Sequence, residues 1–238
     1  MFFVDIPLLP QVEDTPVGFY AKGPEYFRAE REINKLLSKS GSPHEAGPSH
    51  VASRNDTWHF RRAVGVLRAG GVISYPTEAV FGLGCNPRNV EAVLRLLALK
   101  ERDISQGLIL VASRFSQLQP FIGTLPPTRM REIQASWPGP VTWIFPAHST
   151  TPAWLTGCHD SLAVRVSANP RVVALCEHFG DALVSTSANI SGHSPARSIL
   201  GVRRQFGRKL DYILPGRVGG RKRPSEIRDG LTGRVLRS

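Results

Sequence analysis

Apolar positions follow two different patterns along residues 56–238. Residues 56–69 carry apolar side chains at roughly helical spacing and end at Gly70-Gly71, which predicts a helix with Asp56 as its cap. Similar spacing predicts helices over residues 90–100, 127–136, 170–179 and 198–206. Short apolar runs typical of buried strands lie between them: GVISY (71–75), GLILVA (107–112), VTWIF (141–145), LAVRV (162–166) and ALVST (182–186). Helices alternating with strands predict an α/β fold, with a twisted, mixed and largely parallel sheet flanked by helices.

The first 54 residues have a different pattern. They hold one helix-like stretch, YFRAEREINKLLSK, between segments punctuated by Pro and Gly, and they end in SGSPHEAGPSH, which resembles a linker. We therefore predict a poorly structured extension over residues 1–54 and a single domain over residues 55–238. Val51 could also correspond to an alternative start codon, in which case the extension would not be native.

The composition supports one soluble core without a membrane anchor. Of 238 residues, 41% are hydrophobic, yet no apolar run approaches the roughly 18 residues that a membrane-spanning helix needs. The three cysteines, Cys85, Cys158 and Cys176, are widely spaced, which excludes a paired disulfide framework and a CxxC metal site. These features predict a protein of the reducing cytoplasm.

The net charge of +11 is concentrated after residue 54. Residues 1–54 carry six Lys/Arg and seven Asp/Glu, so the rest of the chain carries 30 − 6 = 24 basic and 19 − 7 = 12 acidic residues. Such an excess indicates a polyanionic partner, either nucleotide phosphates or RNA, although it also fits a well-solvated basic surface.

Small polar residues gather where the last predicted strand ends, in LVSTSANISG (183–192). Ser, Thr and Asn often cap a following turn, so they have a structural interpretation. In an open α/β sheet the same residues would form a polar rim at the carboxyl edge, where ligands bind. A second loop, PTEAVFGLG (76–84), follows the first strand, and its two glycines would let the backbone approach a ligand.

Three cations occupy positions that suit an anion. Lys100 and Arg102 lie at the end of the predicted helix 90–100, where they could only complement the helix dipole or could bind a polyphosphate. Arg165 interrupts the apolar run LAVRV, and a buried arginine needs an anionic partner, either a structural carboxylate or a substrate.

The ordered motifs YPTEAVFGLG, LKER, GLILVA, WPGPVTWIFPA, SLAVRV, LVSTSANISG and PSEIRD resemble the YrdC/Sua5 family, most closely its short bacterial TsaC branch. The resemblance covers residues 56–237 and implies a single YrdC-like domain. It implies an enzyme that condenses L-threonine, bicarbonate and ATP into threonylcarbamoyl-adenylate and pyrophosphate. Mg²⁺ would accompany ATP, and the product would serve threonylcarbamoyl modification of adenosine 37 in ANN-decoding tRNAs through downstream transfer proteins.

The resemblance also implies roles for individual residues. The KxR and SxN motifs correspond to Lys100, Arg102, Ser187 and Asn189, implied to bind the nucleotide phosphates and to carry catalysis. The residues associated with threonine are Thr77, Arg165 and Ser185. Further contacts with ATP are implied for Pro224, Ser225 and Arg237. Thr186 keeps a structural role.

The sequence departs from the family pattern in two motifs. PTDTVYGL appears as PTEAVFGL and PST as PSE, so no contact is carried over to Glu78, Phe81 or Glu226.

Two alternatives to the synthase compete with it. The basic domain and the family's attraction to double-stranded RNA suggest an RNA-binding protein acting in rRNA or ribosome maturation. The related module of hydrogenase-maturation carbamoyltransferases is disfavoured, because those proteins carry zinc fingers and this chain has no paired CxxC motifs.

Overall fold

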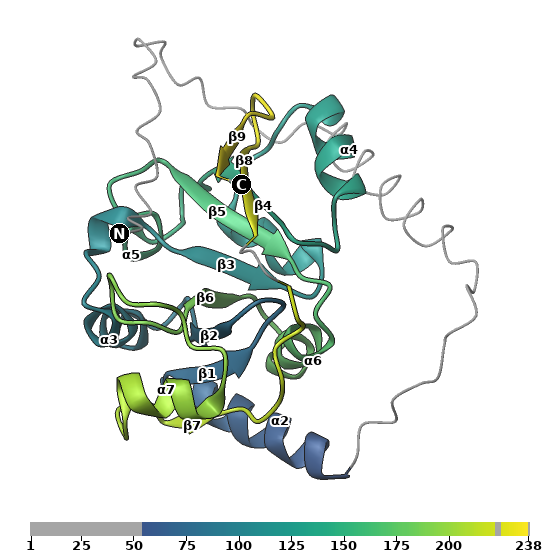
Figure 1. Cartoon of the computed structure of the whole chain (residues 1–238). Helices are drawn as coiled ribbons and strands as arrows, with labels where there is room; N and C mark the ends of the chain where they lie inside the picture. The colour runs from purple at the N-terminus through teal and green to yellow at the C-terminus, as the bar shows by residue number, and fades with distance from the viewer. Residues whose placement is uncertain (1–53, 222–224, 238) are drawn as a thin grey trace. The chain divides into compact units, whose positions relative to one another are not determined.

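The computed structural model describes residues 54–221 and 225–237 (Figure 1). The extension predicted over residues 1–54 lies outside this range except for Arg54, and so does Pro224. The boundary between extension and domain therefore stays a prediction.

The five predicted helices are present: those over residues 90–100 and 170–179 have the predicted ends, and the ends of the other three are shifted by at most two residues. They are α2 (Arg54–Arg68), α3 (Val90–Lys100), α4 (Pro127–Ala135), α6 (Pro170–Phe179) and α7 (Ile199–Phe206), joined by a single turn, α5 (Ala153–Thr156), and three 3₁₀ turns, η1 (Ile104–Gln106), η2 (Phe115–Gln117) and η3 (Gln119–Phe121). Side-chain caps begin three of them: for α3, the Asn89 side chain accepts from the backbone N–H of Ala92 at 2.9 Å. None of the helices in the described ranges is long and apolar enough to cross a membrane.

Asp56 does not cap its helix as predicted. Because α2 begins at Arg54, Asp56 lies in the first turn. Its carboxylate instead accepts from Nη2 of Arg171 at the start of α6, at 3.3 Å. Asp56 thus joins two helices, and its negative charge still complements the helix N-terminus.

The described residues form one nine-stranded sheet in the order β7-β1-β2-β6-β3-β5-β4-β8-β9. The strands are β1 (Ile73–Pro76), β2 (Phe81–Gly84), β3 (Ile109–Ala112), β4 (Val141–Pro146), β5 (Ser161–Val166), β6 (Leu183–Ser187), β7 (Tyr212–Ile213), β8 (Glu226–Asp229) and β9 (Val235–Arg237). The prediction of a mixed sheet is confirmed: β1–β7, β3–β5 and β4–β8 are parallel, and the other neighbours are antiparallel.

Four strands were not predicted. We interpreted Phe81–Gly84 as part of a loop because of its two glycines, but it is β2, which pairs with β1 and β6. Strands β7, β8 and β9 have two to four residues each, too few to show an apolar period.

Helices pack on both faces of the sheet. On one face, α3, α4, α5 and α7 contribute Leu96, Ile133, Leu155 and Phe206 to the larger core, against strand residues such as Trp143. On the other face, α2 and α6 lie side by side and pack over β1, β3 and β6 (Figure 1). The second face is the one that carries the candidate site.

Gly84 tests the packing within this sheet. A Cβ at Gly84 would lie 2.6 Å from the carbonyl oxygen of Val184 and 2.8 Å from a ring carbon of Tyr75. We expect Gly84→Ala to lower the free energy of unfolding by about 1–3 kcal/mol, measured by denaturant titration, because the backbone has to shift.

Gly65 provides the matched control, since it lies exposed in α2 and a Cβ added there would have nothing within 4 Å. Gly65→Ala should leave stability unchanged or raise it by up to about 1 kcal/mol through helix propensity. Equal stabilities of the two alanine variants would contradict the described packing.

Candidate active site

One row of paired residues crosses four strands and carries two of the predicted site residues. In this row Arg165 of β5 lies beside Thr142 of β4, because Trp143 pairs with Val164 in the antiparallel ladder. Thr142 pairs with Ile227 of β8, and Ile227 pairs with Arg237 of β9. Directly paired residues point to the same side of a sheet, so the side chains of this row share one face, which we call the site face.

The polar end of β6 belongs to the same face. Arg165 pairs with Val111, which pairs with Leu183, and side chains two positions apart share a face, so Ser185 and Ser187 lie on the side of Leu183. Towards β4 and β8 this face carries a small apolar cluster of Ile144, Ala163 and Ile227, to which the described helices contribute no residue. The site face therefore combines serines, arginines and a small apolar floor.

Lys100 links the end of α3 to the end of β6. Its Nζ donates to the carbonyl oxygens of Ser187 at 2.6 Å and Asn189 at 2.9 Å, and its own carbonyl accepts from Ser191. Burial, and then the nearby charge of Arg102, lower the pKa of the Lys100 ammonium to about 7. An ammonium has three donors, so one remains for a ligand.

Ser187 and Asn189 also bind each other. The Ser187 hydroxyl donates to Oδ1 of Asn189 at 2.6 Å, and Nδ2 of Asn189 donates to the Ile190 carbonyl at 2.9 Å. The KxR and SxN motifs, which lie 87 residues apart at Lys100 and Ser187, are therefore in direct contact.

Arg102 follows Glu101, whose left-handed backbone (φ 51°) ends α3 and turns the chain. Its Nη2 donates to the Gly107 carbonyl at 3.0 Å, while its Nε is buried without a hydrogen-bond partner. Burial lowers the pKa of the Arg102 guanidinium from its usual value. This unpaired donor is available to an anion beside Lys100.

Arg165 is paired on one side only. Its Nη2 lies 3.4 Å from Oε2 of Glu78, and the Ser167 hydroxyl donates to Oε1 of Glu78 at 2.8 Å. The Arg165 side chain is only 10% exposed, and its Nε has no hydrogen-bond partner. Arg165 thus has a structural carboxylate as its partner, and its unpaired Nε leaves the role in substrate binding a prediction.

Thr77 is the residue before Glu78 and directly follows β1. Its hydroxyl donates to the Val80 carbonyl at 2.7 Å, and its carbonyl accepts from Gly219 at 2.9 Å. The hydroxyl oxygen of Thr77 remains able to accept a hydrogen bond from a ligand.

Arg237 and Ser225 meet at the far end of the row. Nη2 of Arg237 donates to the Ser225 carbonyl at 2.9 Å, and the Thr142 hydroxyl donates to that of Ser225 at 3.1 Å. Burial, and then the charge of Arg165, lower the pKa of the Arg237 guanidinium. Pro224, predicted beside Ser225, lies outside the described residues.

Three of the predicted site residues carry a buried arginine nitrogen without a hydrogen-bond partner. Four buried side-chain nitrogen or oxygen atoms in the described part of the chain have no hydrogen-bond partner, and three are the Nε atoms of Arg102, Arg165 and Arg237. A buried polar atom without a partner is costly, and a bound ligand is one common way to satisfy it. Carboxylate and phosphate oxygens match the guanidinium donors best.

The structure corrects two details of the predicted site. The polar residues of β6 do not form a rim where parallel strands end, because both neighbours of β6 are antiparallel to it. Ser185 and Ser187 lie on the site face, and Thr186, which pairs with Leu83, lies on the opposite face. Gly82 and Gly84 belong to β2, where their missing side chains leave room for the ring of Tyr75.

Sequence reasoning missed three residues of this region: Thr142, Glu78 and Tyr75. Thr142 is a polar residue inside the apolar run VTWIF, which was the signal available to find it. Glu78 and Tyr75 could not be assigned from the pattern, because their contacts are with residues 89 and 110 positions away.

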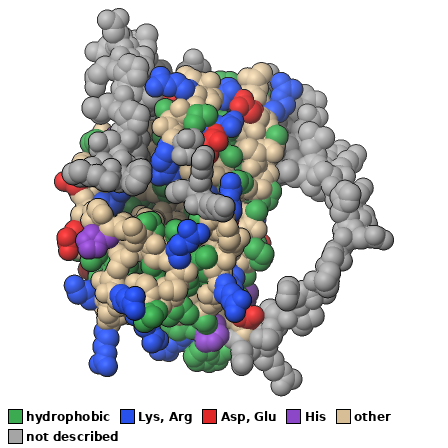
Figure 2. Space-filling model, in the orientation of Figure 1, with side chains coloured by type: hydrophobic (Ala, Val, Ile, Leu, Met, Phe, Trp, Pro, Cys, Tyr) green, Lys and Arg blue, Asp and Glu red, His purple; other side chains and the backbone are tan. Residues whose placement is uncertain are grey.

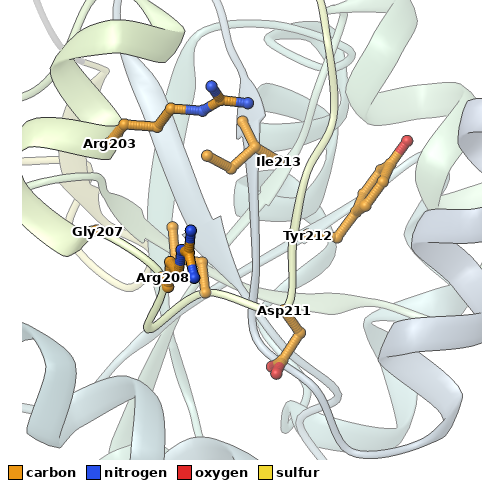
Figure 3. Close-up of a pocket in the computed structure, with 7 residues that line it drawn as sticks. Arg203, Gly207, Arg208, Asp211, Tyr212 and Ile213 are labelled. Atoms are coloured by element: carbon orange, nitrogen blue, oxygen red, sulfur yellow. The ribbon is translucent and has the colours of Figure 1, made fainter.

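A hollow of about 650 Å³ beside α7 and β7 contains none of the predicted site residues (Figure 3). Its lining is Arg203, Gly207, Arg208, Leu210, Asp211, Tyr212 and Ile213. The Asp211 carboxylate accepts two hydrogen bonds from Arg95, at 2.7 and 3.0 Å. Lys and Arg side chains are also spread more widely than acidic ones over the face shown in Figure 2, in keeping with the basic charge after residue 54.

Comparisons with known proteins agree with the described geometry. The family model Sua5_yciO_yrdC, described as "Telomere recombination", matches residues 65–238. A threonylcarbamoyl-AMP synthase of Halorhodospira halophila is 56% identical over 180 residues, which are 76% of this chain and 94% of the relative. One of Escherichia coli O1:K1 is 55% identical over 177 residues, covering 74% and 93%.

A solved structure with bound L-threonine is also similar. The crystal structure of P. abyssi Sua5 complexed with L-threonine has a TM-score of 0.69 and 32% identity, and the match covers 72% of this chain and 51% of that one. The chain thus spans about half the length of that Sua5. Taken together, the matched residues and the shared fold show that this chain belongs to the Sua5/YciO/YrdC family.

Proposed function

We propose that this protein is a threonylcarbamoyl-AMP synthase, which joins L-threonine, bicarbonate and ATP into threonylcarbamoyl-adenylate and releases pyrophosphate. The observation that carries the proposal is the set of buried, unpaired Nε atoms of Arg102, Arg165 and Arg237 around one face of the sheet. All three substrates are anions or carry a carboxylate, so each can satisfy such donors. Two relatives that align with this chain over nearly all of their own length are named for the same activity.

The reaction needs two bond-forming steps. The amine nitrogen of threonine attacks the carbon of CO₂ and loses a proton, or attacks that of bicarbonate with loss of a water molecule, and either route gives a carbamate. A carbamate oxygen then attacks the α-phosphorus of ATP, and pyrophosphate leaves with the electron pair of the broken P–O bond. No covalent enzyme intermediate forms, so the residues act by positioning the substrates and neutralising phosphate charge.

Threonine would bind at the Arg165 side of the site face. The free Nε of Arg165 would donate to the threonine carboxylate, while Glu78 holds the other side of the guanidinium in position. Thr77 and Ser185 supply hydroxyl groups for the remaining polar atoms of threonine.

ATP would bind at both ends of the face. Lys100 and Arg102, supported by Ser187 and Asn189, would contact phosphate oxygens where charge develops on the leaving pyrophosphate. Ser225 and Arg237 would hold another part of the nucleotide at the β8–β9 end. These residues form the proposed catalytic and nucleotide-binding set.

Magnesium would arrive with ATP rather than occupy a site built by the protein. The described residues contain no group of three or more His, Cys, Asp or Glu that could hold a metal ion. Mg²⁺ keeps much of its water and binds phosphate oxygens, so it would need few protein ligands here and would supply charge neutralisation at the phosphates.

The product would be consumed by transfer proteins that modify adenosine 37 of tRNA, and a cytoplasmic location follows from these substrates. A role as a double-stranded RNA-binding protein in ribosome maturation is not favoured, because basic charge and family resemblance support it only indirectly, whereas the named relatives are synthases.

The proposed activity is tested by incubating the full chain with ATP, labelled bicarbonate and L-threonine. We expect threonine-dependent pyrophosphate release and a labelled adenylate. Arg102→Ala should lower kcat/KM by about 10- to 100-fold, because it removes a charge-assisted contact worth about 1.5–3 kcal/mol. Arg61→Ala, at an exposed position of α2, is the matched control and should keep normal kinetics. Pyrophosphate release that does not depend on added threonine would contradict the proposal.

Lys100 predicts how ATP affinity depends on pH. With a pKa lowered to about 7, the ammonium is charged below this pH and becomes neutral above it. ATP affinity, measured by calorimetry, should therefore fall as pH rises from about 7 to about 8.5, by at most about tenfold per pH unit.

Two variants assign this loss of affinity to its source. Lys100→Met should bind ATP weakly at every pH and lose this dependence, whereas Lys209→Met, at an exposed lysine, should keep it. A flat profile of the unaltered protein, or an unchanged slope in Lys100→Met, would refute the role of Lys100.

A further inference from the structure

Tyr75 reaches across a whole strand to contact a predicted site residue. It belongs to β1, yet its hydroxyl donates to Oγ of Ser185 on β6 at 2.8 Å, with β2 lying between them. Both residues are buried: Tyr75 is 0% exposed and Ser185 8%. A contact between second-neighbour strands needs space above the strand that separates them.

The two glycines of β2 provide this space. Gly82 pairs with Tyr75, and a Cβ there would lie 3.5 Å from ring atom Cε2. A Cβ at Gly84 would lie 2.8 Å from Cε1 and 3.1 Å from the Tyr75 hydroxyl oxygen. The phenol ring therefore lies over the side of β2 that has no side chains. The FGLG stretch is thus explained by this ring rather than by a ligand.

The hydrogen bond has a preferred direction. A phenol is a much stronger acid than an aliphatic alcohol, so it is the better donor of the two hydroxyl groups. Burial raises the pKa of Tyr75 well above its ordinary value, so the phenol keeps its proton over the working pH range. Ser185 therefore accepts from Tyr75, and its own proton must find another acceptor.

Nothing in the described residues accepts that proton. The hydrogen bond from Tyr75 is the one recorded for the Ser185 side chain there. Ser185 lies on the site face and pairs with Ile109 of β3, which pairs with Ala163 of β5. Because Ala163 is two residues before Arg165, Ser185 lies in the row next to that of Arg165. A donor at this position faces the region where the threonine carboxylate would bind Arg165.

We propose that Tyr75 is a positioning residue, which fixes the Ser185 hydroxyl as a donor to an oxygen of L-threonine. The proposal rests on the proposed function, because threonine is the substrate that Ser185 would contact. It assigns Tyr75 no contact with substrate: the effect passes through Ser185 alone.

The variant Tyr75→Phe removes only the phenol oxygen and keeps the ring that fills the space above β2. We expect KM for L-threonine to rise about three- to tenfold, the size of one lost hydrogen bond, with KM for ATP and kcat changed less than about twofold. Tyr212→Phe is the matched control, because it removes another tyrosine hydroxyl. Tyr212 belongs to the edge strand β7, and its hydroxyl lies 2.6 Å from Nδ1 of His59 in α2. This control should keep all three parameters.

A double-mutant cycle separates positioning from a general structural effect. In a Ser185→Ala background the Tyr75→Phe change should alter KM for L-threonine by less than about twofold, because the residue through which Tyr75 acts is gone. An equal rise in both backgrounds, or an unchanged threonine KM in folded Tyr75→Phe, would overturn the proposal. If Tyr75→Phe fails to fold, Ser185→Ala alone decides: an unchanged threonine KM in that variant overturns the proposal as well.

Failure of the proposed function gives a different result. In that case the unaltered protein would release no pyrophosphate in response to threonine, and calorimetry would detect no threonine binding. An active unaltered protein with a Tyr75→Phe variant of normal threonine KM would refute the positioning role while leaving the proposed function intact.

Discussion

The structure depends on one constraint: it buries arginine side chains whose hydrogen-bond donors the protein satisfies only in part. Arg165 and Arg237 lie close enough for one charge to affect the other, and the carboxylate of Glu78 is the acidic group recorded at Arg165. Buried cations are costly unless their charge and donors are matched. The protein satisfies some donors with carbonyl oxygens and Glu78 and leaves three Nε atoms without a partner. We propose that bound anions satisfy these three donors.

The sheet topology makes this arrangement possible. Because β6 is antiparallel to both neighbours, its polar end meets the end of α3, and Lys100 can bind two carbonyls that follow each other closely in the chain. Strands β4, β8 and β9 extend the sheet beyond the part that α2 and α6 cover. Residues far apart in sequence, from Arg165 to Arg237, are thereby brought to one face by strand pairing, and Lys100 reaches the end of β6 from the end of α3.

Much of the fold and the site could be predicted from the sequence, for physical reasons. Helix α3 and strand β5 show clear periods, and Arg165 stood out because a charge in an apolar run needs a partner. Strand β2 was missed because glycines usually mark loops. Here the two glycines leave space for the ring of Tyr75 on the neighbouring strand. The contact of Glu78 with Arg165 was equally hidden, since local pattern carries no information on which residues meet across the sheet.

The central claim, that substrate anions complete the buried arginines, can be measured at the atoms concerned. Proton–nitrogen NMR of the arginine Nε–H groups, assigned with single Arg→Lys variants, reports each donor directly. The account predicts that the Nε–H signals of Arg102, Arg165 and Arg237 shift and become protected from solvent exchange when ATP and L-threonine saturate the protein, while that of exposed Arg61 does not. Signals of the three buried groups that stay unchanged at saturation would contradict it.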